Sequence, residues 1–138
     1  MMPLDLGAKG SCQIGGNLST NAGGIKFIKY NSMHANCLGL EIALADGTVI
    51  SNINRTRKDN TAYDLKHLFI GAEGTLGMIT GCSIVCPPLP TNKQLCLVAS
   101  NDFDQVLNCL HISKRELADQ LSAIEFMDWE SVKLSLDY

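Results

Sequence analysis

The sequence predicts an α+β fold in two parts. Apolar runs rich in strand-forming residues alternate with short stretches of helical periodicity, so strands and helices are mixed along the chain. Glycine-rich stretches interrupt these runs at residues 15–24, 45–47 and 71–77. A proline cluster at residues 87–90 separates the two parts, because proline donates no hydrogen bond to a strand ladder and fixes its own φ angle.

In the first part, residues 37–45 and 48–51 predict a β-hairpin. The run CLGLEIALA is apolar almost throughout, and the Asp46-Gly47 pair that follows favours a type I′ turn, in which both central residues have positive φ. Polar and basic residues from 52 to 62 predict an exposed connection between this hairpin and the next element.

A short helix and a third strand complete the first part. The apolar residues between 63 and 70 fit one face of a short helix, with Asp64 where an N-cap or first-turn acid is favoured. Residues 78–86 are mostly apolar and predict a buried strand.

The second part predicts half of a further α+β unit. Strands are expected over residues 94–100 and 121–127. One helix is expected after Asn101 or Asp102, either of which could cap it, and another over residues 129–136. Such a unit lacks the layers that would cover its apolar faces, so we expect a fragment or natural truncation of a larger protein.

The composition indicates a folded protein and argues against two classes of partner. Of the 138 residues, 46% are apolar and 18% charged, which is typical of a globular domain. The net charge of −3 comes without any basic stripe, which excludes nucleic acid as the main partner. The apolar runs are also far shorter than the ~20 residues that span a bilayer.

The six cysteines are expected to be reduced, buried thiols. They lie mostly in apolar strand-like or helix-like patterns, and no secretory signal precedes them, so a disulfide framework is the less favoured reading. Zinc at Cys82 and Cys86 is disfavoured because a structural site needs four ligands and no partner residues lie nearby.

The glycine-rich stretches are the best candidates for a binding site. Glycine lets a backbone approach a ligand and present bare N–H groups, although it also marks ordinary turns. The spacing at residues 15–24 fits neither a Rossmann fingerprint nor a Walker loop. In the second stretch Glu73 could bond a ribose hydroxyl or cap its own loop, and the residue types leave both readings open.

No general acid or base stands out. His34, His67 and His111 lack a positioned partner in the sequence, and His67 and His111 are expected at the surface. The chemistry should therefore belong to a bound cofactor or to residues outside this chain.

Taken together, these stretches resemble the FAD-linked oxidases of the vanillyl-alcohol oxidase type, which carry a PCMH-type FAD-binding domain. The resemblance follows the chain in order over nearly its whole length, through residues 12–24, 38–48, 57–71, 73–77, 86–88 and 125–128. One departure is Ala62, where the family usually has glycine. That β-carbon puts a positive φ at this position in doubt, since it costs roughly 1 kcal/mol or more.

The resemblance implies the second half of a PCMH-type FAD-binding domain at residues 1–88, followed by the start of a truncated α+β substrate (cap) domain at residues 89–138. It implies FAD as cofactor. The first stretch would line the flavin and pyrophosphate, and the second would approach the rest of the dinucleotide. The implied FAD-binding residues are Gly15, Gly16, Asn17, Thr20, Asn21, Ala22, Gly23, Gly24, Glu73, Gly74, Gly77, Met78 and Ile79.

The implied activity is oxidation of a D-2-hydroxyacid, with D-2-hydroxyglutarate converted to 2-oxoglutarate by hydride transfer to the flavin. Electrons would pass to an acceptor such as electron-transfer flavoprotein, and the location would be the mitochondrial matrix, although the chain carries no transit-peptide pattern. The family's upstream pyrophosphate loop and downstream metal site have no counterpart in these residues. We therefore expect weak FAD binding and no turnover by this chain alone, with no catalytic residue or metal ligand assigned. The alternatives are a non-catalytic nucleotide- or flavin-binding module and a nonfunctional truncated product.

Overall fold

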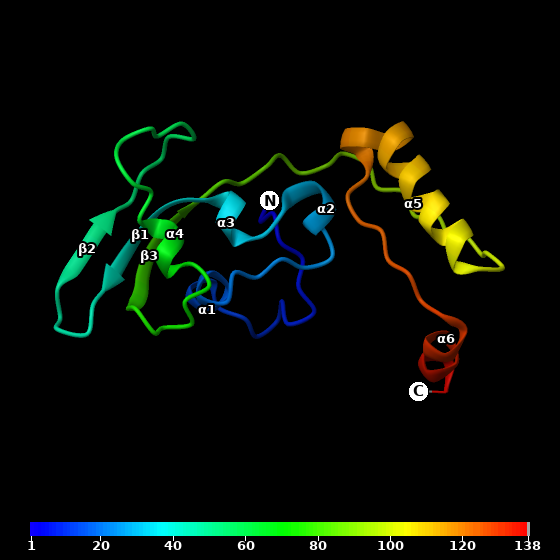
Figure 1. The fold of residues 1–138 in the computed structure, drawn as a ribbon, viewed down its shortest axis with the longest axis horizontal. Helices are drawn as coiled ribbons and strands as arrows, with labels where there is room; N and C mark the ends of the chain where they lie inside the picture. Colours follow the sequence, from blue (N-terminus) through cyan, green and yellow to red (C-terminus); the bar gives the residue numbers. More distant parts are fainter. Residues whose placement is uncertain (138) are drawn as a thin grey trace.

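A three-stranded antiparallel sheet is the centre of the first part of the chain. The computed structural model describes residues 1–137, and Tyr138, the last residue of the expected substrate domain, lies outside the described residues. Strands β1 (Cys37–Ala43), β2 (Val49–Asn52) and β3 (Met78–Ile84) are arranged in the order β2-β1-β3 (Figure 1). The three predicted strands of this part are confirmed with slightly different bounds, but β3 is not buried as predicted, since Met78 and Thr80 are exposed and its other residues half-buried.

The predicted hairpin is present, but its turn type is wrong. The loop between β1 and β2 is closed by hydrogen bonds from Gly47 N to Leu44 O and from Leu44 N to Thr48 O. Only Gly47 has positive φ, at 85°, whereas a type I′ turn would require it of Asp46 as well. Asp46 instead accepts a hydrogen bond from the backbone of Thr48. The carboxylate is therefore used to brace the turn, which the D-G pair alone does not reveal.

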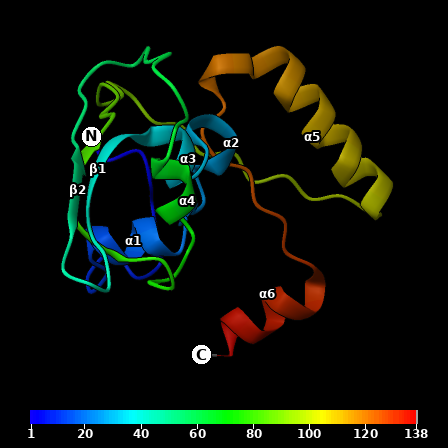
Figure 2. The same ribbon diagram turned by 60° about the vertical axis from the view of Figure 1, so that its left-hand side comes forward.

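The first part also contains four short helices. They are α1 (Ile14–Ser19), α2 (Phe27–Tyr30), α3 (Met33–Asn36) and α4 (Lys66–Phe69). In Figure 2, α1, α3 and α4 lie together on one side of the strands. The helix predicted at residues 63–70 is confirmed but begins at Lys66, and no side chain caps it.

A small apolar core joins these helices to β1. Its buried residues are Leu4, Leu18, Met33, Cys37, Leu40, Ile42 and Ile70. Leu18 of α1 and Met33 of α3 are completely inaccessible to solvent, and Leu40 and Ile42 come from alternate positions of the central strand. The core therefore depends on residues from several separate segments, all within the first 70 positions.

The second part consists of an extended segment and two helices. α5 (Phe103–Leu117) continues into a 3₁₀ turn (Ala118–Gln120), and α6 (Trp129–Leu136) follows. Asp102 caps α5 by accepting a hydrogen bond from Gln105 N at 2.8 Å, and Asp128 caps α6 through Ser131 N. Both predicted helices are confirmed, and Asp102 is the cap of the first.

The two strands predicted in the second part are wrong. Residues 94–100 and 121–127 adopt no strand in the structure. Leu95 and Leu97 are 86% and 88% exposed, so their alternating side chains have no apolar surface to cover. A strand requires hydrogen-bonded neighbours as well as suitable residues, and no described segment pairs with either stretch.

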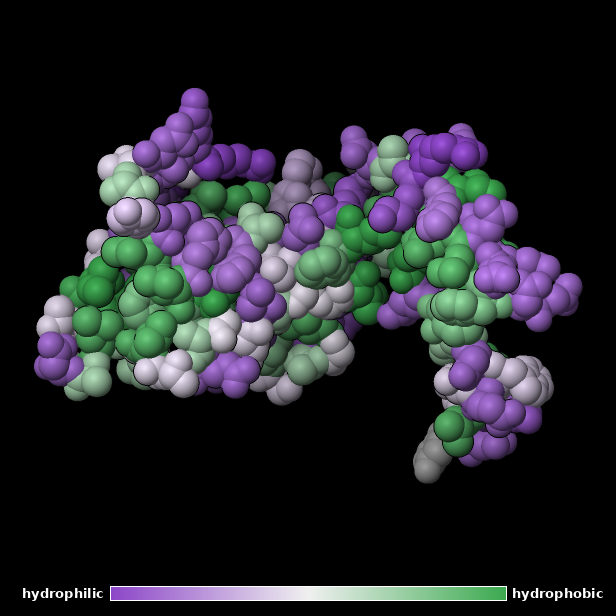
Figure 3. All heavy atoms as spheres, in the orientation of Figure 1, coloured by the Kyte–Doolittle hydropathy of each residue, from purple (hydrophilic) through white to green (hydrophobic). Residues whose placement is uncertain are grey.

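Apolar surface remains exposed over the sheet. Figure 3 shows it at the end of the molecule that carries the strands. Val49, Ile50 and Met78 are among the exposed hydrophobic residues there. Among residues 1–137, no helix combines the length and apolar character needed to cross a membrane.

The cysteines are free, but not all are buried as predicted. Cys37 is buried, Cys82 and Cys109 are half-buried, and Cys12, Cys86 and Cys96 are exposed. The prediction of core thiols is therefore wrong for the last three, because their segments lie outside the core that the apolar pattern suggested.

We predict that Cys37 resists alkylation while the exposed cysteines react. Burial raises the pKa of the Cys37 thiol to about 11, which leaves on the order of one thousandth of it as thiolate at pH 8. Iodoacetamide at pH 8 should label Cys12, Cys86 and Cys96 first, as read by mass spectrometry of peptides. Unfolding in urea should abolish the difference, and equal labelling of Cys37 in the native chain would contradict its burial.

We predict that Ala62→Gly stabilises the chain. Ala62 adopts a φ of 52° despite its β-carbon, so the family's positive φ persists here, contrary to the doubt raised by the sequence. Glycine would remove a strain of about 1–2 kcal/mol but lose part of that gain to unfolded-state entropy, leaving a net gain of about 0.5–1 kcal/mol. Urea denaturation measures the change. Ala35→Gly, made within helix α3, is the matched control and should instead destabilise.

Candidate functional site

The two glycine-rich stretches lie side by side, held by backbone hydrogen bonds. Gly71 N donates to Leu18 O at 3.0 Å, and Glu73 N donates to Ser19 O at 2.9 Å. A β-carbon on Gly71 would lie 3.4 Å from the Asn21 side chain. The two stretches are far apart in the sequence, and the fold brings them together at the C-terminal end of α1.

The first stretch is half helix rather than a loop. Gly15 and Gly16 belong to α1, and the chain leaves the helix at Thr20 before Asn21 turns with a φ of 50°. Within the described residues, the N–H groups of Gly15 and Gly16 have no backbone acceptor. Free N–H groups in the first turn of a helix can donate to an anion or a carbonyl oxygen.

The glycines of the site fall into two groups by what surrounds them. A β-carbon added to Gly16 or Gly74 would meet nothing within 4 Å, so the backbones of these two residues are open to a ligand. Gly24 and Gly77 are instead closed by protein: a β-carbon on Gly24 would overlap Asp5 O, and one on Gly77 would lie 2.7 Å from Ile42. Neighbouring protein leaves no room for a side chain at Gly24 or Gly77, whereas Gly16 and Gly74 have free space beside their backbones.

Gly23 belongs with the closed glycines. A β-carbon on Gly23 would lie 2.9 Å from the Phe27 ring, which fills the space beside this residue. The expected contact of Gly23 with the cofactor stays a prediction, made through its backbone and not through the side occupied by Phe27.

The polar side chains of the first stretch are partly used inside the protein. Thr20 Oγ1 donates to Gly16 O at 2.9 Å, and Asn21 Oδ1 accepts from His34 N at 3.0 Å. Asn17 Nδ2 reaches Cys12 Sγ at 3.6 Å. These contacts leave the Asn21 amide donor available and give the stretch a defined shape.

Ala22 contributes its backbone to the same stretch. Its N–H bonds to Asn17 O, and its carbonyl accepts from Met33 N. The end of α1 is thereby tied to the start of α3, which carries Met33 into the core.

The second stretch is strained at Glu73. This residue has a φ of 50° and is followed by Gly74 at 81°, so two successive residues are left-handed. The Glu73 side chain is exposed and has no hydrogen-bond partner within residues 1–137, while Thr75 Oγ1 bonds Ala72 O. The reading in which Glu73 caps its own loop is therefore wrong, and its carboxylate faces solvent beside the open Gly74.

Beyond this stretch, Met78 and Ile79 begin β3. Met78 is exposed, whereas Ile79 packs against the core, and its carbonyl would lie 3.6 Å from a β-carbon on Gly15. A recess of about 60 Å³ lies between α1 and β3, bordered by Gly15 and Ile79. It is far smaller than the roughly 300–1,000 Å³ of a ligand pocket, so the site is an open surface.

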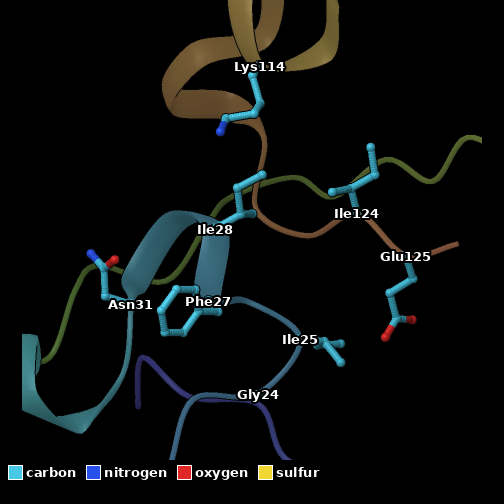
Figure 4. A pocket seen from close by; sticks show the side chains of 8 residues that line it. All are labelled: Gly24, Ile25, Phe27, Ile28, Asn31, Lys114, Ile124 and Glu125. Carbon is cyan, nitrogen blue, oxygen red and sulfur yellow. The ribbon is translucent and has the colours of Figure 1, made fainter. Parts of the chain in front are cut away.

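A larger cavity of about 500 Å³ lies elsewhere, between α2 and the second part of the chain. Figure 4 shows Ile28 of α2 beneath Lys114 of α5, with the Phe27 ring below it and Ile124 and Glu125 to one side. Of the glycine-rich residues only Gly24 borders it. It is therefore separate from the surface that the two stretches form together.

The sequence reading missed the role of two histidines. His34 lies in α3 and contacts both glycine-rich stretches through Asn21 and through Ile70 O, 3.1 Å from its Nε2. His67 packs edge-on against His34, with ring centroids 4.7 Å apart. Burial lowers the pKa of His67. No spacing rule would join two residues so far apart in the chain, whereas His111 is exposed as expected.

We predict that Gly24→Ala destabilises the chain by about 3 kcal/mol, because its φ of 90° is strained for alanine and the β-carbon would overlap the Asp5 carbonyl. Thermal unfolding followed by circular dichroism measures the loss. Gly10→Ala, where nothing lies within 4 Å, is the control and should change stability by less than about 0.5 kcal/mol. Equal stability of the two variants would show that Gly24 is not closed by protein.

Comparison with known proteins agrees with the motifs. Residues 1–52 match the FAD binding domain family. The chain is 54% identical to D-2-hydroxyglutarate dehydrogenase, mitochondrial, of Rattus norvegicus over 97% of its length, and 51% identical to a probable mitochondrial D-2-hydroxyglutarate dehydrogenase of Oryza sativa over all of it. Over the whole length of this chain, it is 50% identical to a D-2-hydroxyglutarate–pyruvate transhydrogenase of Saccharomyces cerevisiae.

The chain spans about a quarter of the length of these relatives, 25% of the rat and rice proteins and 28% of the yeast protein. The resemblance to FAD-linked oxidases is thus confirmed: residues 1–52 carry the sequence of an FAD binding domain, and the chain as a whole is similar to a quarter-length segment of D-2-hydroxyglutarate dehydrogenases.

Proposed function

We propose that this chain supplies part of the FAD site of a D-2-hydroxyacid dehydrogenase. The observation that carries the proposal is the juxtaposition of the two glycine-rich stretches, with Gly71 N and Glu73 N bonded to the end of α1. About half of the residues are identical to those of relatives named as D-2-hydroxyglutarate dehydrogenases. That identity favours D-2-hydroxyglutarate as the substrate and 2-oxoglutarate as the product.

The residues present fit a flavin dinucleotide. The free N–H groups at Gly15 and Gly16 suit phosphate or carbonyl oxygens, and the open backbone at Gly74 allows close approach. The exposed Glu73 carboxylate, free of internal hydrogen bonds among the described residues, suits a ribose hydroxyl. When bound, FAD would accept the hydride from the substrate carbon. The packing glycines Gly24 and Gly77 would act by holding these groups in place.

The chain's own residues would bind and orient the cofactor rather than catalyse. Within residues 1–137 no three His, Cys, Asp or Glu residues cluster as a metal site would require. The hydroxyacid, the electron acceptor, such as electron-transfer flavoprotein, and any divalent metal would be handled by other segments of a longer protein. We assign residues 1–88 to the FAD-binding domain and residues from 89 onward to the beginning of the substrate domain.

The relatives' names also suggest where this protein acts. Those of rat, rice and cattle are called mitochondrial, so we propose the same location for this protein.

The second candidate, a truncated product without activity, is favoured by the exposure of residues such as Leu95 and Trp129, which nothing in the described chain covers.

We predict that Gly16→Ala weakens FAD binding without lowering stability. Gly16 is helical and open, so alanine should stabilise α1 by roughly 0.5–1 kcal/mol while its methyl group blocks approach to the backbone. The dissociation constant for FAD, measured by flavin fluorescence, should rise by about tenfold, which corresponds to the loss of one good hydrogen bond.

Gly7→Ala is the control for this experiment, because its β-carbon would also meet nothing within 4 Å and it lies outside the site. It should leave FAD affinity unchanged. The proposal fails if the wild-type chain shows no saturable FAD binding, or if Gly16→Ala and Gly7→Ala bind equally well.

A further inference from the structure

His34 bonds to the first glycine-rich stretch and to the residue that immediately precedes the second. His34 lies in the first turn of α3, where its backbone N–H donates to Asn21 Oδ1 at 3.0 Å. Its side-chain Nε2 lies 3.1 Å from Ile70 O, the carbonyl immediately before Gly71. The main chain of His34 therefore holds the end of the first stretch, and its ring holds the start of the second.

The ring contact specifies which nitrogen carries the proton. A carbonyl oxygen only accepts hydrogen bonds, so Nε2 must be protonated for the 3.1 Å contact to be a hydrogen bond. His34 is half-buried, and with a proton on Nε2 its ring donates toward Ile70 O.

Both neighbouring backbones are left-handed. Asn21 has a φ of 50° and Gly71 a φ of 83°, a region that asparagine and glycine adopt more readily than other residues. Ile70 is buried, so its carbonyl depends on a protein partner in place of water. His34 satisfies that carbonyl and fixes the direction in which the chain enters the second stretch.

The groups around His34 support its orientation. His67 of α4 packs edge-on against the ring at 4.7 Å, and its own Nε2 lies 3.3 Å from Asp64. Asp64 also pairs with Lys66. These contacts come from the segment that leads into Gly71, so the ring is enclosed by the element whose carbonyl it binds.

We propose that His34 is a positioning residue for the FAD site, setting the spacing of the two glycine-rich stretches through its Nε2–H···Ile70 O hydrogen bond. This inference rests on the proposed FAD-binding function for its consequence, but the bond itself can be tested without FAD. His34 would act through Asn21 and Ile70, the two residues it bonds.

Two substitutions at His34 distinguish the effect of the hydrogen bond from the effect of ring packing. His34→Phe keeps the ring and its edge contact with His67 but removes the donor. His34→Gln loses the ring but places an amide donor at a similar distance from the backbone. His111→Phe, on the exposed face of α5, is the control. Amide hydrogen exchange at Gly71 and Glu73 and the FAD dissociation constant are measured on the whole chain for each variant.

If the inference is correct, His34→Phe speeds exchange at Gly71 and Glu73 by roughly two- to tenfold, the loss expected of one hydrogen bond, and weakens FAD binding by a similar factor. His34→Gln and His111→Phe should resemble the wild type. If His34→Gln speeds exchange at these amides while His34→Phe exchanges like the wild type, ring packing and not the hydrogen bond sets the spacing, and the inference is overturned. Unchanged exchange in both variants would also overturn it. If the wild-type chain fails to bind FAD, the proposed function is wrong, and the exchange data still decide the positioning role.

Discussion

Two backbone hydrogen bonds, from Gly71 to Leu18 and from Glu73 to Ser19, are the constraint on which the rest of the first part depends. They join the end of α1 to the segment between α4 and β3. Leu18 anchors the same point from inside, since it is completely buried in the core. Backbone bonding and apolar packing thus act at one place, and every candidate cofactor contact is positioned relative to it.

The glycines around this joint have different roles although they look alike in the sequence. At Gly24 and Gly77 the missing β-carbon lets two parts of the protein meet, at the Asp5 carbonyl and at Ile42. At Gly16 and Gly74 the same absence leaves backbone exposed to solvent. The first pair shapes the site and the second pair forms its surface. Such a division arises because a ligand and a neighbouring strand both require close backbone approach.

The candidate site is an open surface rather than an enclosed pocket. Its recess beside α1 is only about 60 Å³, and its core is a small cluster of buried hydrophobic residues. Its sheet carries exposed apolar residues such as Val49 and Met78. These features agree with a match to about a quarter of the length of its relatives. An open surface with free donor groups is compatible with the proposed contact to a cofactor.

Local chemistry is sufficient to predict the hairpin at residues 37–52, β3, and the helices α5 and α6, because periodicity and capping act over a few residues. The order of the motifs along the chain likewise indicates the FAD-linked family by itself. Long-range packing decides the rest. It leaves residues 94–100 without a strand partner and brings His34 against Ile70. Those outcomes depend on which distant segment packs against the residues concerned, and the local sequence around a residue does not determine that.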